Sequence, residues 1–211
     1  MMGWVPGPGD RGQTSIGAQT EVWKDALILE VLGTLDELNS HLGLARSLGV
    51  SEPIDGLLSR IQGELFQIGA ELAAGPAEPP PQLPTPRTQP AETEPLRKSV
   101  GQVVPLSARQ VEMLGAEIAE WGGRVPKVQK FILPAGHPAA CQLHVARAVC
   151  RRAERRLTSL VRHSAPGTVS PWIQAYLNRL SDLLFILARS VNQQAGHQET
   201  AWEPPSPPEE D

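Results

Sequence analysis

The sequence is poor in cysteine, in aromatic residues and in net charge, and each shortage argues against a class of protein. Its two cysteines, Cys141 and Cys150, form no disulfide framework, and their separation matches no usual metal-ligand spacing. Aromatic residues make up 4% of the 211 residues, so a core has to be built mainly from Leu, Ile, Val and Ala. A formal net charge of −4 argues against a general polyanion binder, so any basic site must be a local one.

Long apolar runs are also missing from the sequence. No stretch is long and apolar enough to span a bilayer. The first ten residues lack both the apolar region of a signal peptide and an Arg-rich amphipathic targeting segment. We therefore expect no membrane partner and a cytoplasmic location, or the mitochondrial matrix if a eukaryotic leader is missing from this sequence.

Apolar residues recur at helical spacing in five segments, and no segment shows the alternation typical of a strand. The first helix is expected to stop at Gly49, while Ser107 with Gln110 forms a capping box that opens the third. Ser170 followed by Pro171 is typical of the start of the fifth helix. The predicted helices cover about residues 24–48, 54–74, 107–122, 138–163 and 170–196. The sequence thus predicts an all-α protein, a five-helix bundle over residues 23–200.

Three regions lack this pattern. Residues 1–22, rich in Gly, Pro, Gln and Thr, are expected to form an irregular N-terminal arm. Residues 75–105 contain repeated proline, which removes backbone donors and forbids helix, so they are expected to be an extended insertion loop within the domain. Residues 201–211 are rich in Pro and acidic side chains and are expected to be a disordered tail.

The fourth helix carries most of the candidate chemistry. At 100° per residue, Arg147, Arg151, Glu154 and Arg155 fall on one of its faces. A row of guanidinium groups on a packed helix favours an anionic ligand, because arginine matches phosphate oxygens with two parallel hydrogen bonds. The main alternative is a solvated face with Glu–Arg pairs within the helix. Nucleic acid is a third possibility, which the acidic net charge and the scarcity of aromatics disfavour.

Further polar candidates lie on the first and fifth helices. Asn178 and Asp182 are four residues apart and share one face of the fifth helix. Asn178 can both donate and accept hydrogen bonds, and Asp182 can balance an arginine. Asp36 lies beside an apolar stripe of the first helix and is a candidate partner for an arginine elsewhere in an assembly, where an unpaired arginine would be costly.

The N-terminal arm contains a short glycine-flanked turn, Gly9-Asp10-Arg11-Gly12. Glycine allows backbone N–H groups to approach a phosphate closely, although such a sequence also occurs in ordinary turns. The turn is not a P-loop, because the required Gly-Lys-Ser/Thr ending is absent.

Taken together, five stretches in this order resemble the PduO-type ATP:cob(I)alamin adenosyltransferases. They are residues 9–12 with Thr14, 33–39, 131–134, 147–156 and 177–182. The resemblance covers most of the chain outside the Pro-rich insertion and the tail. It implies an enzyme that transfers the 5′-deoxyadenosyl group of ATP to the cobalt of a reduced corrinoid. It also implies a homotrimer of five-helix bundles, with ATP and Mg²⁺ bound between subunits and an adenosylcobalamin-dependent enzyme as a possible recipient of the product.

The resemblance also implies roles for residues of the nucleotide site. Arg151 would hold the ATP phosphates, and Glu154 and Asn178 would line the same site. The other ATP-binding residues implied are Gly9, Asp10, Gly12, Thr14 and Lys24.

The corrinoid site and the subunit interface are implied in the same way. Phe131 would press on the corrinoid face and displace its lower axial ligand, and Asp182 would support that site. Arg147 and Asp36 would pair across the subunit interface. No cluster of side chains is expected to hold a metal, since Mg²⁺ would arrive with ATP.

The chain departs from the family pattern in its arm. Relatives usually carry Thr-Lys-Thr where this chain has Pro6, Gly7 and Pro8, and a usual arginine is replaced by Glu21, while Lys24 is kept. These changes remove positive charge from the phosphate end of the site. They motivate an alternative function, that of a non-catalytic corrinoid- or nucleotide-binding protein of the same fold.

Overall fold

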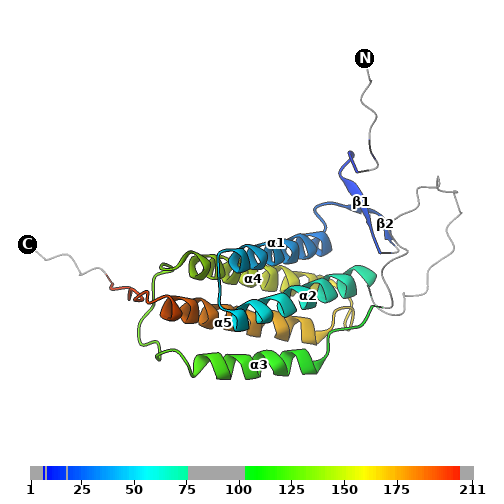
Figure 1. Cartoon of the computed structure of the whole chain (residues 1–211). Coiled ribbons are helices and arrows are strands. Elements are labelled where there is room, and N and C mark those ends of the chain that lie inside the picture. Colours follow the sequence, from blue (N-terminus) through cyan, green and yellow to red (C-terminus); the bar gives the residue numbers. More distant parts are fainter. Residues whose placement is uncertain (1–6, 8, 18, 76–102, 205–211) are drawn as a thin grey trace, which may run out of the picture.

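A computed structural model describes residues 7, 9–17, 19–75 and 103–204 of the chain (Figure 1). It shows five helices and one small two-stranded sheet, which confirms the predicted all-α class. The elements are β1 Gln13–Ile16, β2 Gln19–Trp23, α1 Leu27–Ser47, α2 Glu52–Ala74, α3 Ala108–Gly122, α4 Pro138–His163 and α5 Pro171–Gln194. The predictions made for residues 76–102 and 205–211 lie outside the described residues.

Local signals place the helix ends as the sequence predicts. The Trp172 backbone N–H donates to the Ser170 hydroxyl over 3.3 Å at the start of α5. The Ser107 N–H donates to the Gln110 side chain over 3.0 Å, the backbone half of a capping box at the start of α3. Gly49 follows the end of α1 with a φ of +87°, a conformation that glycine adopts without steric cost.

The N-terminal arm is not wholly irregular, contrary to the prediction. β1 and β2 pair as an antiparallel hairpin, with Thr14 opposite Val22 and a shift of register between Thr14 and Ile16. The Lys24 N–H donates to the Gly12 carbonyl over 2.9 Å and extends the pairing toward α1. Strands of four and five residues interrupted by a bulge are too short to show a period of two in the sequence, so the hairpin was not predictable from alternation.

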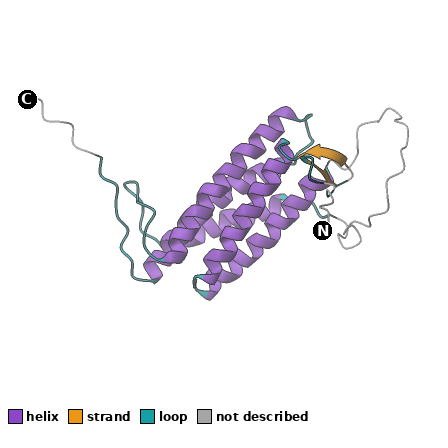
Figure 2. Ribbon diagram, turned by 90° about the horizontal axis from the view of Figure 1, so that it is seen from above, coloured by secondary structure: helices purple, strands orange, loops and turns teal. Residues whose placement is uncertain are grey.

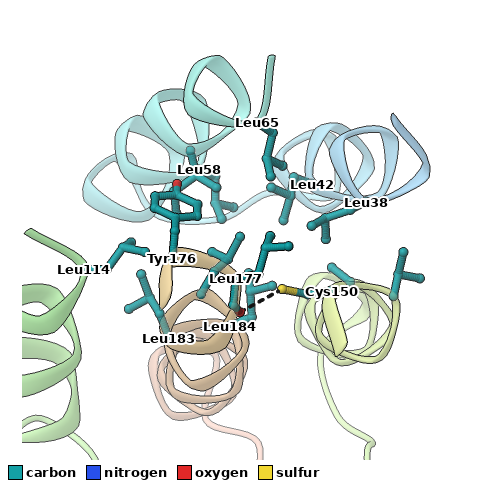
Figure 3. Close-up of a cluster of buried hydrophobic side chains, with 14 of the residues drawn as sticks. Leu38, Leu42, Leu58, Leu65, Leu114, Cys150, Tyr176, Leu177, Leu183 and Leu184 are labelled. Atoms are coloured by element: carbon teal, nitrogen blue, oxygen red, sulfur yellow. Dashed lines mark hydrogen bonds between the residues drawn. The ribbon is translucent and has the colours of Figure 1, made fainter. Parts of the chain in front are cut away.

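The core is built by helix α4 packing between α1 and α5. Figure 2 shows the helices running side by side in one bundle, and Figure 3 shows leucines from several helices meeting in its centre. Burying each leucine contributes about 1.5–3 kcal/mol to folding. The buried stripe of α4 consists of Leu143, Ala146, Cys150, Ala153 and Leu157, all 0% exposed. Their three- and four-residue spacing commits one face of α4 to the core.

The Cys150 thiol donates to the Leu177 carbonyl over 3.3 Å, a contact drawn in Figure 3. Burial raises the pKa of this thiol, so it is held as the neutral SH group. Cys141 is half-buried, and both cysteines are free. Cys150 therefore serves helix packing, as its sequence context predicts.

The two ends of the bundle carry different structures. The β1–β2 hairpin lies at one end, and the connector between α3 and α4 lies at the other, beside the segment that follows α5 (Figure 1). Ala201 forms a bridge with Ile132, and the Trp202 N–H donates to the Phe131 carbonyl over 2.7 Å. Within the described residues, the start of the predicted tail thus pairs with the connector through Ala201 and Trp202. No helix in the described ranges is long and apolar enough to cross a membrane.

Candidate nucleotide and corrinoid site

Two arginines of α4 form ion pairs with α1. Arg152 pairs with the Glu37 carboxylate, and this partner lowers the pKa of Glu37. Arg156 Nη2 lies 2.8 Å from Glu30 Oε2, and the same guanidinium donates to the buried Thr34 hydroxyl. Since Arg152 and Arg156 are four residues apart, they share the face of α4 that lies toward α1.

The side chains of three further arginines of α4, like that of Arg162 near the helix end, form no hydrogen bond or ion pair with any described residue. They are Arg147, Arg151 and Arg155, spaced four residues apart on the neighbouring face of the helix. Arg151 and Arg155 are exposed and Arg147 is half-buried. The row predicted from the sequence thus exists, and its charges are left free while Arg152 and Arg156 are neutralised within the chain.

Glu154 and Asn178 join α4 to α5 beside this row. The Asn178 side-chain amide donates to Glu154 Oε1 over 3.1 Å. The alternative of Glu–Arg pairs within α4 does not hold for Glu154, because the side-chain partner of its carboxylate is Asn178 and not an arginine. Three of the predicted nucleotide-site residues, Arg151, Glu154 and Asn178, therefore lie together on the surface where α4 meets α5.

Asp182 lies one turn after Asn178 and is exposed. Asp182 lies in the same part of the surface as Arg151 and Glu154, and the charges of all three affect the pKa of the buried Cys150 thiol. Burial is the main cause that raises the pKa of this thiol, Glu154 and Asp182 raise it further, and Arg151 opposes them. The surface of α4 and α5 thus combines an exposed cation with two carboxylates and an amide.

The arm residues form a compact turn of their own. The Lys24 ammonium donates to the Gly9 carbonyl over 2.7 Å, and the Gly7 N–H donates to the Asp10 carboxylate over 2.5 Å. Gly12 has a φ of +81°, which favours glycine there. Thr14 follows on β1, beside an open hollow of about 590 Å³. Neither Lys24 nor Asp10 nor Thr14 forms a hydrogen bond or ion pair with an α4 arginine.

Phe131 lies on the connector at the far end of the bundle. Its side chain is 79% exposed, and its ring meets that of Trp202 edge to face with centroids 6.4 Å apart. Arg151 lies thirteen residues beyond the first residue of α4, about 20 Å along the helix axis. No hydrogen bond, ion pair or ring contact among the described residues joins Phe131 to Arg147, Arg151 or Arg155.

The pair predicted across a subunit interface is not formed within the chain. Asp36 is exposed and has no hydrogen bond or ion pair among the described residues. Arg147 Nε is buried without a partner there, and the guanidinium carbon lies 5.7 Å from the centre of the Phe185 ring. The fold therefore leaves the half-buried Arg147 guanidinium on α4 and the exposed Asp36 carboxylate on α1 without ionic partners among the described residues.

Sequence reasoning missed a buried cluster next to Arg147. His144 is 5% exposed, both of its ring nitrogens lack hydrogen-bond partners, and its ring lies 6.0 Å from that of Phe185. Burial lowers the pKa of His144, Arg147 lowers it further, and Glu199 partly opposes them. No spacing of histidines in the sequence signals this environment.

Comparison with known proteins agrees with the geometry. A family model described as cobalamin adenosyltransferase matches residues 5–191. The chain belongs to the cobalamin adenosyltransferase family. A cobalamin adenosyltransferase of Cupriavidus metallidurans is 35% identical over 196 residues, covering 92% of this chain and 91% of that protein. A corrinoid adenosyltransferase of Bacillus subtilis is 36% identical over 200 residues, covering 92% and 89%.

Solved structures from the same family share the fold. A phenylalanine-to-alanine variant of a PduO-type ATP:corrinoid adenosyltransferase from Lactobacillus reuteri, complexed with cobalamin and ATP, superposes with a TM-score of 0.75 at 29% identity. It covers 93% of this chain and 97% of that one. An arginine-to-lysine variant complexed with ATP gives a TM-score of 0.73 at 30% identity, covering 93% and 98%. The family match ends at residue 191, so the segment after α5 that pairs with Phe131 lies beyond it.

The buried state of His144 leads to a prediction about pH. In the unfolded chain His144 has its ordinary pKa of about 6.5, and in the folded protein burial lowers this pKa, so the imidazole takes up a proton only at lower pH. Stability contributed here is therefore lost as the pH falls below about 6.5, by up to about 1.4 kcal/mol per pH unit. Denaturant unfolding measured between pH 7 and 5 should show that the free energy of unfolding falls less steeply with decreasing pH in His144→Leu than in the wild type.

The exposed His163 provides the control for this experiment. His163→Gln should keep the wild-type slope of unfolding free energy against pH. An unchanged slope in His144→Leu would contradict the assignment.

Proposed function

We propose that this chain is an ATP:corrinoid adenosyltransferase that transfers the 5′-deoxyadenosyl group of ATP to the cobalt of cob(I)alamin, forming adenosylcobalamin and releasing triphosphate. The observation that carries the proposal is the row of Arg147, Arg151 and Arg155 on α4, left unpaired beside Glu154 and Asn178. Support comes from family relatives that share most of the chain's length and from neighbours complexed with cobalamin and ATP.

The chemistry suits such a site. The electron pair of cobalt(I) forms the new bond to C5′ of ATP, the C5′–O bond breaks, and triphosphate leaves with the electron pair of the broken C5′–O bond. No proton has to move, so the chain needs no general base and no protein nucleophile. Catalysis then depends on holding the reactants in line and on stabilising the leaving charge. Arg151 is suited to the second task, because an exposed guanidinium without a partner can bind two phosphate oxygens.

Phe131 provides the apolar surface for the corrinoid. A ring that is 79% exposed and backed by Trp202 offers a flat face to a planar macrocycle. In this proposal Phe131 presses on the corrinoid and displaces its lower axial ligand, which makes the cobalt easier to reduce. Asp182 supports the same site.

A homotrimer would complete the site. Asp36 and Arg147, which lack ionic partners within the chain, would pair across the subunit interface and relieve the half-buried guanidinium. The arm with Gly9, Asp10, Gly12, Thr14 and Lys24 would then serve the α4 arginines of a neighbouring subunit. The lack of hydrogen bonds and ion pairs between this arm's Lys24, Asp10 and Thr14 and its own α4 arginines supports that arrangement.

Magnesium would accompany the triphosphate rather than occupy a protein cage. Within the described residues, no group of three or more His, Cys, Asp or Glu side chains is placed to hold a metal. In this proposal the phosphate oxygens of ATP would hold the ion. The proposal also includes delivery of the product to an adenosylcobalamin-dependent enzyme. It includes the predicted location in the cytoplasm, or in the mitochondrial matrix if a eukaryotic leader is missing from this sequence.

The second candidate function is a non-catalytic corrinoid- or nucleotide-binding protein of this fold. The observation that favours it is the arm turn, where Gly7 stands at the position of a usual lysine and donates its N–H to Asp10. Position 7 therefore contributes a backbone N–H bound to a carboxylate, and no cationic side chain of its own.

A direct assay distinguishes the two functions. Purified protein with ATP, Mg²⁺ and chemically reduced cobalamin should form adenosylcobalamin, followed by its visible absorbance. Corrinoid binding without turnover, with turnover restored by Gly7→Lys, would instead establish the binding protein. Absence of both turnover and corrinoid binding would contradict the proposal.

Exchanging one arginine tests the phosphate role. Arg151→Lys should lower turnover by about 10- to 100-fold, because a point charge replaces a two-pronged donor worth about 1.5–3 kcal/mol. Arg156→Lys is the matched control on the same helix, since Arg156 pairs with Glu30 of its own chain. Equal and small effects of the two variants on turnover would show that the free row is only a solvated face.

A further inference from the structure

The connector that carries Phe131 is fastened on both sides of this residue by the last turns of α5. Upstream, Arg189 Nη2 donates to the Pro126 carbonyl over 2.8 Å. Downstream, the Asn192 amide donates to the Ala135 carbonyl over 2.9 Å. Arg189 and Asn192 are three residues apart, so one face of α5 holds both ends of the loop.

The downstream anchor also explains a glycine. Gly136 has a φ of +110°, and a Cβ atom there would lie 2.2 Å from the Asn192 side-chain oxygen. That oxygen accepts the His137 N–H over 2.9 Å, and Asn192 is 3% exposed. The connector can approach α5 this closely only because residue 136 has no side chain.

The upstream anchor depends on an ion pair with the segment after α5. Arg189 Nε and Nη2 lie 2.8 and 2.9 Å from the two carboxylate oxygens of Glu199. The side chains are 6% and 25% exposed. Because a buried guanidinium without a partner is costly, Glu199 fixes Arg189, and Arg189 in turn joins the post-α5 segment to the connector.

The post-α5 segment then lies directly along Phe131. The Trp202 N–H donates to the Phe131 carbonyl over 2.7 Å, and the Leu133 N–H donates to the Thr200 carbonyl over 2.9 Å. Lys130 and Glu203 add an ion pair of 2.6 Å on the exposed side. Residues 199–203 thus run alongside residues 130–133, joined by backbone hydrogen bonds and an isolated bridge between Ile132 and Ala201, and we call this pair of segments the Phe131 ribbon.

We propose that Arg189 and Glu199 are positioning residues, which set the place of Phe131 against the corrinoid without touching the substrate themselves. The inference rests on the proposed function and extends it to a segment outside the family match. Loss of the Arg189–Glu199 ion pair detaches the Phe131 ribbon from α5, so the Phe131 ring is no longer held in one position against the corrinoid. A misplacement of about 1 Å is enough to cost about 100-fold in rate.

The test is Glu199→Gln, which keeps the side-chain shape and removes the charge. It should lower kcat by about 10- to 100-fold and leave the KM for ATP within about twofold, since the nucleotide site is untouched. Amide hydrogen exchange at Leu133 and Trp202 should become faster. In a Phe131→Ala background, Glu199→Gln should lower kcat no further, because both changes act through the same ring.

Arg46→Gln is the control, because Arg46 forms an ion pair of the same geometry with Asp55, at 2.8 and 2.9 Å, between α1 and α2. This variant should keep kcat within about twofold of wild type, as expected for a partly exposed pair. If Glu199→Gln does not fold, Arg189→Met combined with Glu199→Leu replaces the ion pair by apolar side chains and should show the same drop in kcat.

Two results would overturn the inference. One is a Glu199→Gln protein with wild-type kcat and unchanged amide exchange. The other is an equal loss of kcat with and without the Phe131 ring. If the wild type itself forms no adenosylcobalamin, the proposed function fails separately, and the amide exchange of Leu133 and Trp202 still decides whether Glu199 holds the Phe131 ribbon.

Discussion

The packing of α4 between α1 and α5 is the interaction on which the remaining structure depends. A stripe of Leu143, Ala146, Cys150, Ala153 and Leu157 fills one face of the helix and is fully buried. With that face fixed in the core, every other residue of α4 has a determined direction. Arg152 and Arg156 form ion pairs with carboxylates of α1. On the next face, Arg151 and Arg155 are exposed and Arg147 is half-buried, and none of the three has a hydrogen-bonded or ionic partner among the described residues. The charge of the site is therefore a consequence of how the core packs.

This division leaves the single chain with parts of a site rather than a finished one. The arm at one end, the arginine row on α4 and the Phe131 ribbon at the other end are each ordered by their own local contacts. The row and the ribbon share one contact, since the guanidinium carbons of Arg147 and Arg189 lie 5.7 and 5.8 Å from the centre of the Phe185 ring. No hydrogen bond or ion pair among the described residues joins the arm to the row. Positioning and charge stabilisation need the parts at fixed distances, so a second copy of the chain is the simplest way to bring them together.

The sequence predicts those features that arise from local spacing. The bounds of α4 agree with prediction because the helix starts at a proline and keeps one apolar period for 26 residues. The grouping of Arg151, Glu154 and Asn178 followed from their spacing and from the family resemblance. The β1–β2 hairpin, the Arg189–Glu199 pair and the contact of Trp202 with Phe131 were not predictable, because each depends on a partner that no periodic pattern identifies.

Completion of the site between subunits is the central claim, and complementation between inactive variants tests it most directly. Lys24→Ala disables the arm and Arg151→Ala disables the α4 row, so each variant alone should be nearly inactive. After unfolding and refolding an equal mixture, about one quarter of the sites should combine an intact arm from one subunit with an intact row from its neighbour. Adenosylcobalamin formation at about a quarter of the wild-type rate is the predicted result. A mixture as inactive as the separate variants would show that arm and row act within one chain, which contradicts the account.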